Sequence, residues 1–363
     1  MKILKIPHQL ADYLCPINGL CDIYEWKTGN RIPDDLLFYS KAGFQLISQK
    51  RATPPKMIFF GQSSIGKREY NYWKNLIGYE IVSNEGRTFK TTLKEIQSLL
   101  DNDIPTILFG LDMYHLPYQQ KFYHECHIPG HVVLMVGYDE KNVYVHDNSK
   151  IGVQTVPVDD LRLAWANDYI GISKRNAYFG IDMKSPNHDI SHIIQQGISR
   201  NANLYLNAPL GFIGIKGINK FIKEFPLWEK TFSEEELKNI YLHFVEYSGS
   251  VLPELPHELS NHNSGIDNPH RASRDKLASA LLNYKSTFGT PYWEEAAHHF
   301  QLSGAIIESI VSGFVEDIQH QTFSRANRYI PLFEKLKEVE RKAFKPLLHT
   351  REIDRSKKAE LML

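Results

Sequence analysis

Segments typical of β-strands stop near the middle of this chain, and this break constrains the fold more than any other feature. Short apolar or alternating segments bounded by Gly, Pro and Asp occur at residues 106–111, 132–136, 143–146 and 153–158. The polar residues 137–142 predict a hairpin between two of them. After Ser185 only helical spacing is found. We therefore predict the α+β fold class, with a mixed domain at residues 1–185 and an all-helical domain at residues 186–363.

Local signals divide the second half into helices. Residues 211–225 carry apolar side chains at helical spacing, and Pro226 is expected to end that helix. Ser233 and Glu236 form a capping box, and Pro291 opens another helix. These signals leave the long segment 252–270 as a loop that could contact an acceptor.

Composition limits the function classes. Lys plus Arg total 42 and Asp plus Glu total 42, so there is no basic excess to bind phosphates, and we expect no nucleic-acid partner. No apolar run reaches the roughly 18 residues of a membrane span. Three cysteines are too few for a disulfide framework, which favours a reducing compartment. Pro7 and Asp12 interrupt any secretory apolar core, so we expect a cytoplasmic protein without a signal peptide.

Cys15 is followed by Pro16 and then by apolar residues at helical spacing. Because proline is preferred at the first position of a helix, Cys15 is expected at the N-cap. Unpaired backbone N–H groups and the helix dipole there stabilise a thiolate. The pattern is typical of a cysteine nucleophile, and the alternative is a buried, unreactive cysteine.

A nucleophilic cysteine requires a base and a group that orients the base. His131 opens one strand of the predicted hairpin, and Asp147 follows the other. His131 is therefore the candidate base and Asp147 the candidate orienting group. Simple counting places Leu134 opposite Asp147, so this contact requires a twisted or bulged hairpin.

The hairpin with His131 and Asp147 resembles the one that carries the base in papain-like cysteine enzymes. In those enzymes the orienting residue lies sixteen positions after the histidine, as Asp147 does here. They also place an oxyanion-hole glutamine six residues before the nucleophile, where this chain has Gln9. The resemblance implies that the Gln9 amide and the Cys15 backbone N–H stabilise an oxyanion.

A narrower resemblance extends over roughly residues 11–283. The N-terminal half is similar to the N-terminal domain of the butirosin biosynthesis protein H (BtrH) family, and the helical half to the domain that often follows it. The matching segments are Cys15 with Leu20, then residues 37–44, 111–118, 129–133, 153–156, 211–218 and 265–282. The resemblance implies a papain-like fold with a nucleophile helix packed on an antiparallel sheet. It also implies an acyltransferase that takes its acyl group from a carrier protein.

Two alternatives compete for residues near the site. His124, Cys126, His127 and His131 are possible zinc ligands, although no Cys-x-x-Cys pair accompanies them. Asp112, Tyr114, His115 and Tyr118 could line a substrate groove, or Tyr114, Leu116 and Tyr118 could anchor this loop to the core. The histidines of segment 252–270 lack a fixed ligand spacing, so we interpret them as solvated.

The sequence thus favours a cysteine-dependent acyltransferase of specialised-metabolite biosynthesis, which acts on an acyl carrier protein or another thioester donor and a small amine. It is expected to use no cofactor and no metal. The alternatives are a papain-like peptidase or amidase, and a binding protein that retains the fold without catalysis.

Overall fold

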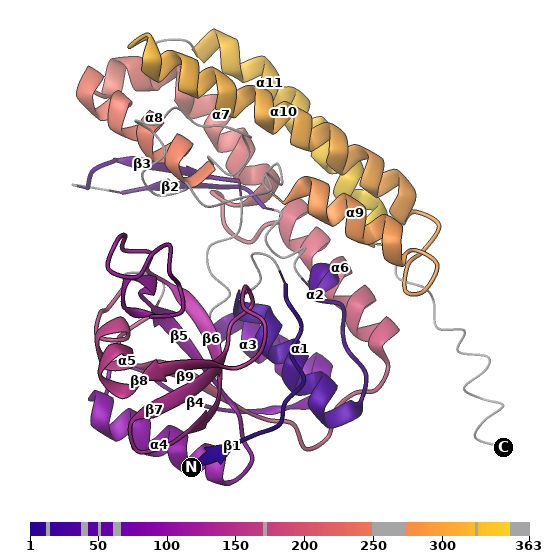
Figure 1. The fold of residues 1–363 in the computed structure, drawn as a ribbon. Coiled ribbons are helices and arrows are strands. Elements are labelled where there is room, and N and C mark those ends of the chain that lie inside the picture. Colours follow the sequence, from indigo (N-terminus) through magenta and orange to yellow (C-terminus); the bar gives the residue numbers. More distant parts are fainter. Residues whose placement is uncertain are drawn as a thin grey trace, which may run out of the picture. The chain divides into compact units, whose positions relative to one another are not determined.

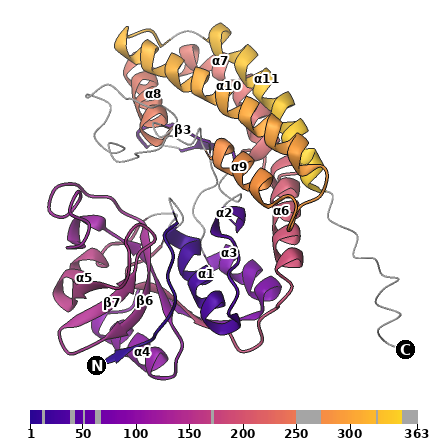
Figure 2. The same cartoon turned by 45° about the vertical axis from the view of Figure 1, so that its right-hand side comes forward.

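The computed structural model describes residues 1–11, 15–37, 43–49, 52–60, 67–169, 173–248, 273–323 and 326–348, without the side chains of 246–248. It separates into two compact units. Unit 1 contains Met1–Asp34 and Ser64–Ile193, and unit 2 contains Asp35–Ser63 and Ile194–Leu363. Figures 1 and 2 show the two units from directions that differ by 45°. Segment 252–270, with its three histidines, lies outside the described residues.

Unit 1 contains a seven-stranded antiparallel sheet among its described residues, in the order β4-β9-β5-β6-β7-β8, and β1 also pairs with β6. The strands are β1 (Lys2–Ile3), β4 (Glu80–Asn84), β5 (Thr106–Leu111), β6 (His131–Tyr138), β7 (Asn142–His146), β8 (Gln154–Pro157) and β9 (Ala177–Asp182). The central strand β6 is buried over its first seven residues, which explains its nearly continuous apolar sequence.

Helices cover both faces of this sheet (Figure 1). The helical segments of unit 1 are α1 (Cys15–Thr28), α3 (Lys67–Trp73), the π-helix Lys74–Gly78, α4 (Phe89–Asp101), the 3-10 helix Met113–His115 and α5 (Val158–Ala164). Gly19 of α1 packs against Ile107, whereas Gly180 of β9 packs against Leu99 of α4. Ile107 pairs with Phe179, the neighbour of Gly180, and neighbouring strand residues point to opposite faces. Helices α1 and α4 therefore cover opposite faces.

Unit 2 is mostly helical. Its helices are α6 (Ile190–Leu206), α7 (Gly214–Thr231), α8 (Glu234–Ser248), α9 (Arg274–Tyr284), α10 (Trp293–Gln319), α11 (Ala326–Phe344) and the 3-10 helix Lys345–Leu348. Two elements lie at unit boundaries, α2 (Asp34–Leu37) and the first turn of α6. The strands β2 (Gln45–Ser48) and β3 (Lys56–Phe59) form a hairpin that packs on α7 and α8.

The predicted α+β fold class is confirmed, with α1 beginning at Cys15 on an antiparallel sheet and helices dominating after it. The division into units differs from two continuous domains at residues 1–185 and 186–363, because residues 35–63 pack with the helices of unit 2. The aromatic rings of Phe44 and Phe60 flank that hairpin and contact Phe333 of α11. Burial of these rings explains why the segment leaves the sheet domain.

Of two local helix signals predicted from the sequence, one matches the structure and the other does not. The Ser233 hydroxyl accepts from the Glu236 N–H at 3.3 Å, and the Glu236 carboxylate accepts from the Ser233 N–H at 2.8 Å, so the predicted capping box is confirmed. Pro226, in contrast, does not end its helix, because α7 continues to Thr231. Pro226 is exposed, and buried Phe225 and Trp228 hold the chain on either side of it.

Candidate active site

Cys15 is the first residue of α1 and Pro16 is the second, which agrees with the predicted helix start to within one residue. Cys15 is half-buried, whereas the residues from Pro16 to Tyr24 are buried. The N-terminus of α1 therefore presents the thiol at the edge of a packed helix, next to backbone N–H groups that lack helical partners. Cys21 of the same helix is fully buried, and burial raises the pKa of its thiol.

A glycine in α1 allows the helix to lie close to the sheet. A Cβ atom at Gly19 would lie 3.0 Å from the Leu134 Cβ of β6, so a larger residue would push the two elements apart. One turn before Gly19 is Cys15, and three residues before Leu134 is His131. Close packing at Gly19 thus directs the N-terminus of α1 toward the beginning of β6.

His131 and Asp147 meet because the pairing of three strands is irregular. The register between β6 and β7 shifts between Met135 and Gly137, which moves the end of β7 one residue along β6. A second irregularity lies opposite His131, where Gly110 of β5 has φ +84°. A Cβ atom at Gly110 would lie 2.2 Å from the Ser173 Oγ, so the bulge depends on glycine.

The His131 Nε2 atom lies 2.6 Å from Oδ2 of Asp147, and both side chains are buried. The side chain of Cys15 is hydrogen-bonded to the same imidazole ring. Since Nε2 is occupied by Asp147, Nδ1 is the nitrogen that is left for the thiol. The structure therefore brings three of the four predicted site residues together.

The electrostatics of this cluster favour a protonated imidazole. Burial alone lowers the pKa of His131, but the Asp147 carboxylate and the Cys15 side chain outweigh it and raise the pKa to about 10. Burial likewise opposes ionisation of Asp147, yet His131 and the Ser149 N–H and hydroxyl lower the pKa of its carboxyl well below the ordinary value. An imidazolium between a carboxylate and a thiolate is the arrangement that activates a cysteine nucleophile.

The Asp147 carboxylate accepts hydrogen bonds on both oxygens. Tyr118 Oη donates to Oδ2 at 2.9 Å and Gln119 Nε2 donates to it at 3.0 Å. The Ser149 N–H and hydroxyl donate to Oδ1 at 3.0 and 2.9 Å. These bonds fix the carboxylate in the plane that faces His131. Gln119 and Ser149 were not predicted as site residues, because nothing in their spacing indicates a contact across 28 residues or a turn at Asp147.

Tyr118 was predicted to line a groove or to anchor its loop. Its hydroxyl donates to the Asp147 carboxylate, and this bond anchors the loop. Asp112 of the same loop accepts from the Tyr114 N–H and pairs with His127 at 2.7 Å. The His127 ring stacks on Tyr114 with centroids 4.1 Å apart. This part of the loop is held by its own contacts.

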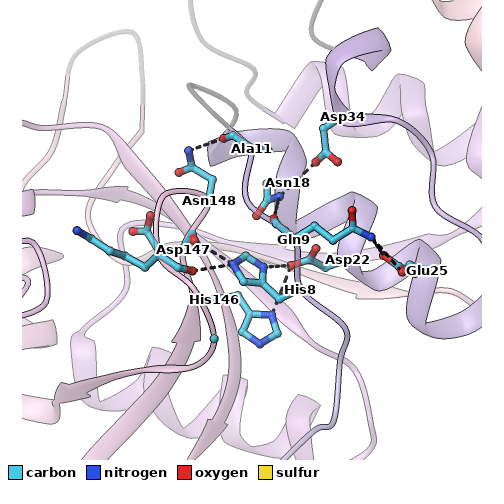
Figure 3. Close-up of polar contacts among 12 residues, drawn as sticks. His8, Gln9, Ala11, Asn18, Asp22, Glu25, Asp34, His146, Asp147 and Asn148 are labelled. Atoms are coloured by element: carbon cyan, nitrogen blue, oxygen red, sulfur yellow. Dashed lines mark hydrogen bonds and ion pairs between the residues drawn. The ribbon is translucent and has the colours of Figure 1, made fainter. Parts of the chain in front are cut away.

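Gln9 does not lie beside Cys15, so its predicted oxyanion role is not supported by the geometry. Its Nε2 donates to both carboxylate oxygens of Glu25, at 3.2 and 3.3 Å (Figure 3). Glu25 is ten residues beyond Cys15 in α1, a separation of about 15 Å along a helix. The exposed Gln9 amide is attracted to this carboxylate, and spacing along the chain could not reveal that.

A second buried cluster lies next to the Asp147 turn (Figure 3). Asp22 of α1 accepts from His8 Nδ1 at 2.7 Å and from Arg31 Nη1 at 2.9 Å. His146 Nδ1 lies 3.4 Å from the same carboxylate, and its ring stacks on that of His8. The sequence analysis did not identify this cluster, since the four residues come from three separate segments.

Among the described residues, His8, Asp22 and His146 form the one group whose possible metal-ligand atoms all lie within 4.8 Å of one another. The two imidazole rings are stacked at 27°, with centroids 4.4 Å apart. Nδ1 of each ring lies near the same Asp22 oxygen, at 2.7 Å for His8 and 3.4 Å for His146, so the ring nitrogens already face the carboxylate. Arg31 already compensates the Asp22 charge. The geometry fits a hydrogen-bonded carboxylate better than a metal centre.

The predicted zinc alternative is not supported by the contacts of its members. His131 is held by Asp147 and Cys15, and His127 by Asp112 and Tyr114. Cys126 Sγ lies 3.9 Å from the His127 carbonyl oxygen. Within the part of the chain that the structure describes, these side chains do not converge on a common point.

Comparison with known proteins gives a family for the domain that carries this site. No curated protein matches the chain. A separate point concerns membranes: none of the described helices is long and apolar enough to cross one. Residues 159–248 match the family described as domain of unknown function DUF4872. Residues 15–148, which include Cys15, His131 and Asp147, match the family model described as butirosin biosynthesis protein H, N-terminal, so the part of the chain that carries the site is similar to that family.

Proposed function

We propose that this protein is a cysteine-dependent acyltransferase, in which Cys15 accepts an acyl or aminoacyl group from a carrier-protein thioester and passes it to an amine. The observation that carries the proposal is the position of His131, which is hydrogen-bonded to Cys15 on one side and to Asp147 on the other. The match of residues 15–148 to a family described by a biosynthesis protein supports the same interpretation.

The first half-reaction transfers the acyl group to the enzyme. The Cys15 thiolate attacks the carbonyl carbon of the donor thioester, and a new S–C bond forms. The tetrahedral intermediate then expels the donor thiolate, which takes the proton from Nδ1 of His131. A thioester is a well-matched donor, because exchange of one thioester for another requires little free energy. Asp147 remains ionised and stabilises the imidazolium before that proton leaves.

The second half-reaction releases the acyl group. Neutral His131 accepts a proton from the incoming amine as its nitrogen attacks the acyl-enzyme carbonyl. Collapse of the second intermediate forms the amide bond and expels the Cys15 thiolate. The imidazolium–thiolate pair is thereby restored, and no net proton is consumed at His131.

The oxyanion of both intermediates needs hydrogen-bond donors. The backbone N–H of Cys15, at the beginning of α1, is one candidate. Gln9 would have to leave Glu25 before it could be a second donor. In the state described, the Cys15 N–H is therefore the donor that we assign.

The proposed partners follow from this chemistry. The donor is an acyl carrier protein or another acyl thioester, and the acceptor is a small amine of a specialised-metabolite pathway such as antibiotic biosynthesis. None of the three cysteines forms a disulfide in the structure, which supports the proposal of a cytoplasmic, reducing environment. No nucleic-acid partner is proposed for a chain with zero net charge.

The experiment that tests this function is capture of the acyl-enzyme. The purified protein is incubated with an acyl-pantetheine thioester, and intact-mass and peptide mass spectrometry locate any added acyl group. We expect one acyl group on Cys15, none in Cys15→Ala, and an unchanged yield in Cys126→Ala. Cys126 is a suitable control because it is also half-buried and free of disulfides.

Release of the trapped group separates transfer from the alternatives. Faster release by added amines than by water supports an acyltransferase. Release by water alone identifies a hydrolase of the peptidase or amidase type. If no acyl-enzyme forms with thioester, ester or amide donors, the proposed covalent mechanism is wrong and a binding role without catalysis replaces it.

A further inference from the structure

His8 lies between the Asp147 turn and helix α1, close to the proposed catalytic residues but outside them (Figure 3). Its Nε2 lies 3.0 Å from the carbonyl oxygens of both Asp147 and Lys150. Its Nδ1 lies 2.7 Å from Oδ2 of Asp22. The side chain is only 5% exposed, so these contacts face little competition from water.

The partners of His8 determine its protonation. Carbonyl oxygens only accept hydrogen bonds, so Nε2 must carry a proton. The Asp22 carboxylate is fully buried, and the nearby His146 ring together with hydrogen bonds from His8 and Arg31 outweighs burial and lowers its pKa, so it also accepts. Nδ1 must then carry a proton as well. His8 is therefore an imidazolium that donates on both sides.

The acceptor side of His8 is the turn that supplies the catalytic carboxylate. The Lys150 N–H donates to the Asp147 carbonyl at 3.0 Å and closes the turn. His8 bonds to the carbonyls at both ends of this turn. Movement of the turn would shift the Asp147 carboxylate relative to Nε2 of His131, and a charge-assisted bond of 2.6 Å depends strongly on such a shift.

The donor side of His8 is anchored in α1, the helix that begins at Cys15. Asp22 is held by Arg31, which also pairs with Glu25 at 2.9 Å and Asp34 at 2.7 Å. The charged groups that surround His8 are therefore Asp22 and Arg31, with His146 stacked on its ring. Through His8, the helix that carries the nucleophile is connected to the turn that carries the orienting carboxylate.

We propose that His8 is a positioning residue for the reaction at Cys15, because its doubly protonated ring fixes the Asp147 turn to Asp22 of α1. The proposal rests on the proposed function of Cys15, His131 and Asp147. Contacts to both turn carbonyls and to Asp22 carry it. The pKa of His8 is raised in the folded protein, since Asp22 and the two carbonyls outweigh burial, which is consistent with this protonation.

Two substitutions separate the two sides of the ring. The amide nitrogen of glutamine can occupy the place of Nε2, so His8→Gln keeps a donor to the turn. The amide nitrogen of asparagine can occupy the place of Nδ1, so His8→Asn keeps only a donor to Asp22. Both variants remove the positive charge. They therefore agree in electrostatics, and each keeps one contact while it breaks the connection between the turn and Asp22.

The measurement is the rate of Cys15 alkylation by iodoacetamide between about pH 6 and pH 9, a range that includes the ordinary cysteine pKa. With the turn released, the rate of His8→Asn at pH 6 is expected to fall about tenfold and to recover at pH 9, where the thiolate forms without help. The rate of His8→Gln, which keeps the turn contact but loses the bond to Asp22, should also fall at pH 6 and recover at pH 9. Asn176→Gly is the matched control, because it removes another buried side-chain bond, to the Arg87 carbonyl at 2.8 Å, within unit 1.

Rates that stay within about twofold of the unaltered protein in both variants, or that are lowered equally at pH 6 and pH 9, would overturn the positioning role. Nitrogen-15 NMR of His8 in the unaltered protein tests the same proposal if a variant does not fold. Two protonated ring nitrogens at neutral pH are expected, and a neutral tautomer would contradict the proposal. Failure of the proposed function is a separate result, in which Cys15 of the unaltered protein reacts no faster at pH 6 than a free thiol.

Discussion

Asn in place of Asp147 removes the charge that holds the proton on His131. The two charge centres lie roughly 4 Å apart when Nε2 and Oδ2 are in contact, and at an effective dielectric constant near 20 their attraction is about 4 kcal/mol. One pH unit corresponds to about 1.36 kcal/mol, so the pKa of His131 should fall by about 3 pH units. We expect a decrease from about 10 to roughly 7.

The surrounding hydrogen bonds prevent asparagine from replacing the carboxylate without loss. Tyr118 and Gln119 donate to one oxygen, and Ser149 donates to the other. In either orientation, the NH₂ group of the introduced asparagine would therefore face a hydrogen-bond donor instead of an acceptor. One mismatched buried group costs about 1–3 kcal/mol, so Asp147→Asn should also unfold at a lower temperature.

The assay is an NMR titration of the His131 ring in both proteins, accompanied by the rate of Cys15 alkylation. Asp139→Asn is the control, because Asp139 also accepts several hydrogen bonds in unit 1 but lies at the β6–β7 turn. In that control His131 should keep its high pKa. If His131 of Asp147→Asn still titrates above about pH 9, the Asp147 charge is not the cause and our electrostatic reasoning is refuted.

Three further predictions follow from the same contacts. At about pH 6, iodoacetamide should modify Cys15 in the folded protein and leave buried Cys21 intact; equal labelling in a peptide map would contradict the site. The folded-state pKa of His131 is above its ordinary value of 6.5, so its contribution to stability is full below 6.5 and is lost as pH rises toward about 10. Chemical unfolding should therefore show the unaltered protein losing stability relative to His131→Gln across that range, and parallel curves would contradict this. In unit 2, Arg274 pairs with Glu340 at 2.7 Å with both side chains fully buried, so Arg274→Met should destabilise the fold by about 3–5 kcal/mol, whereas the double variant with Glu340→Leu should recover much of the loss. A double variant as unstable as the single one would show that the unpaired charge is not the cause.

The sequence predicted the strands whose signals are local. Residues 106–111 correspond to β5, and the hairpin of β6 and β7 lies where its polar turn indicated. Strands β1, β2, β4 and β9 were not predicted. Strand β1 has only two residues. Strand β9 pairs with β4 and β5, and both of these strands lie far before it in the sequence. Pairing over such distances leaves no periodic signal.

The site was predicted in part for the same reason. The start of α1 and the ends of two strands have local signals, which led to Cys15, His131 and Asp147. Register shifts in the sheet decide whether His131 and Asp147 meet. From the sequence we could predict that a twist or bulge was required, but not where it lies. The role of Gln9 was inferred from the resemblance to papain-like enzymes, and its side chain is instead hydrogen-bonded to the Glu25 carboxylate.

The central claim, an imidazolium–thiolate pair at Cys15 and His131, is tested most directly by the ultraviolet absorbance of the thiolate. The difference between the unaltered protein and Cys15→Ala is followed from about pH 4 to pH 10, a range that includes the free-thiol pKa of about 8.5. We predict that the Cys15 thiolate is already present at about pH 6 and is lost only in more acidic solution. A thiolate signal that first appears near pH 8.5, as in a free thiol, would contradict the account.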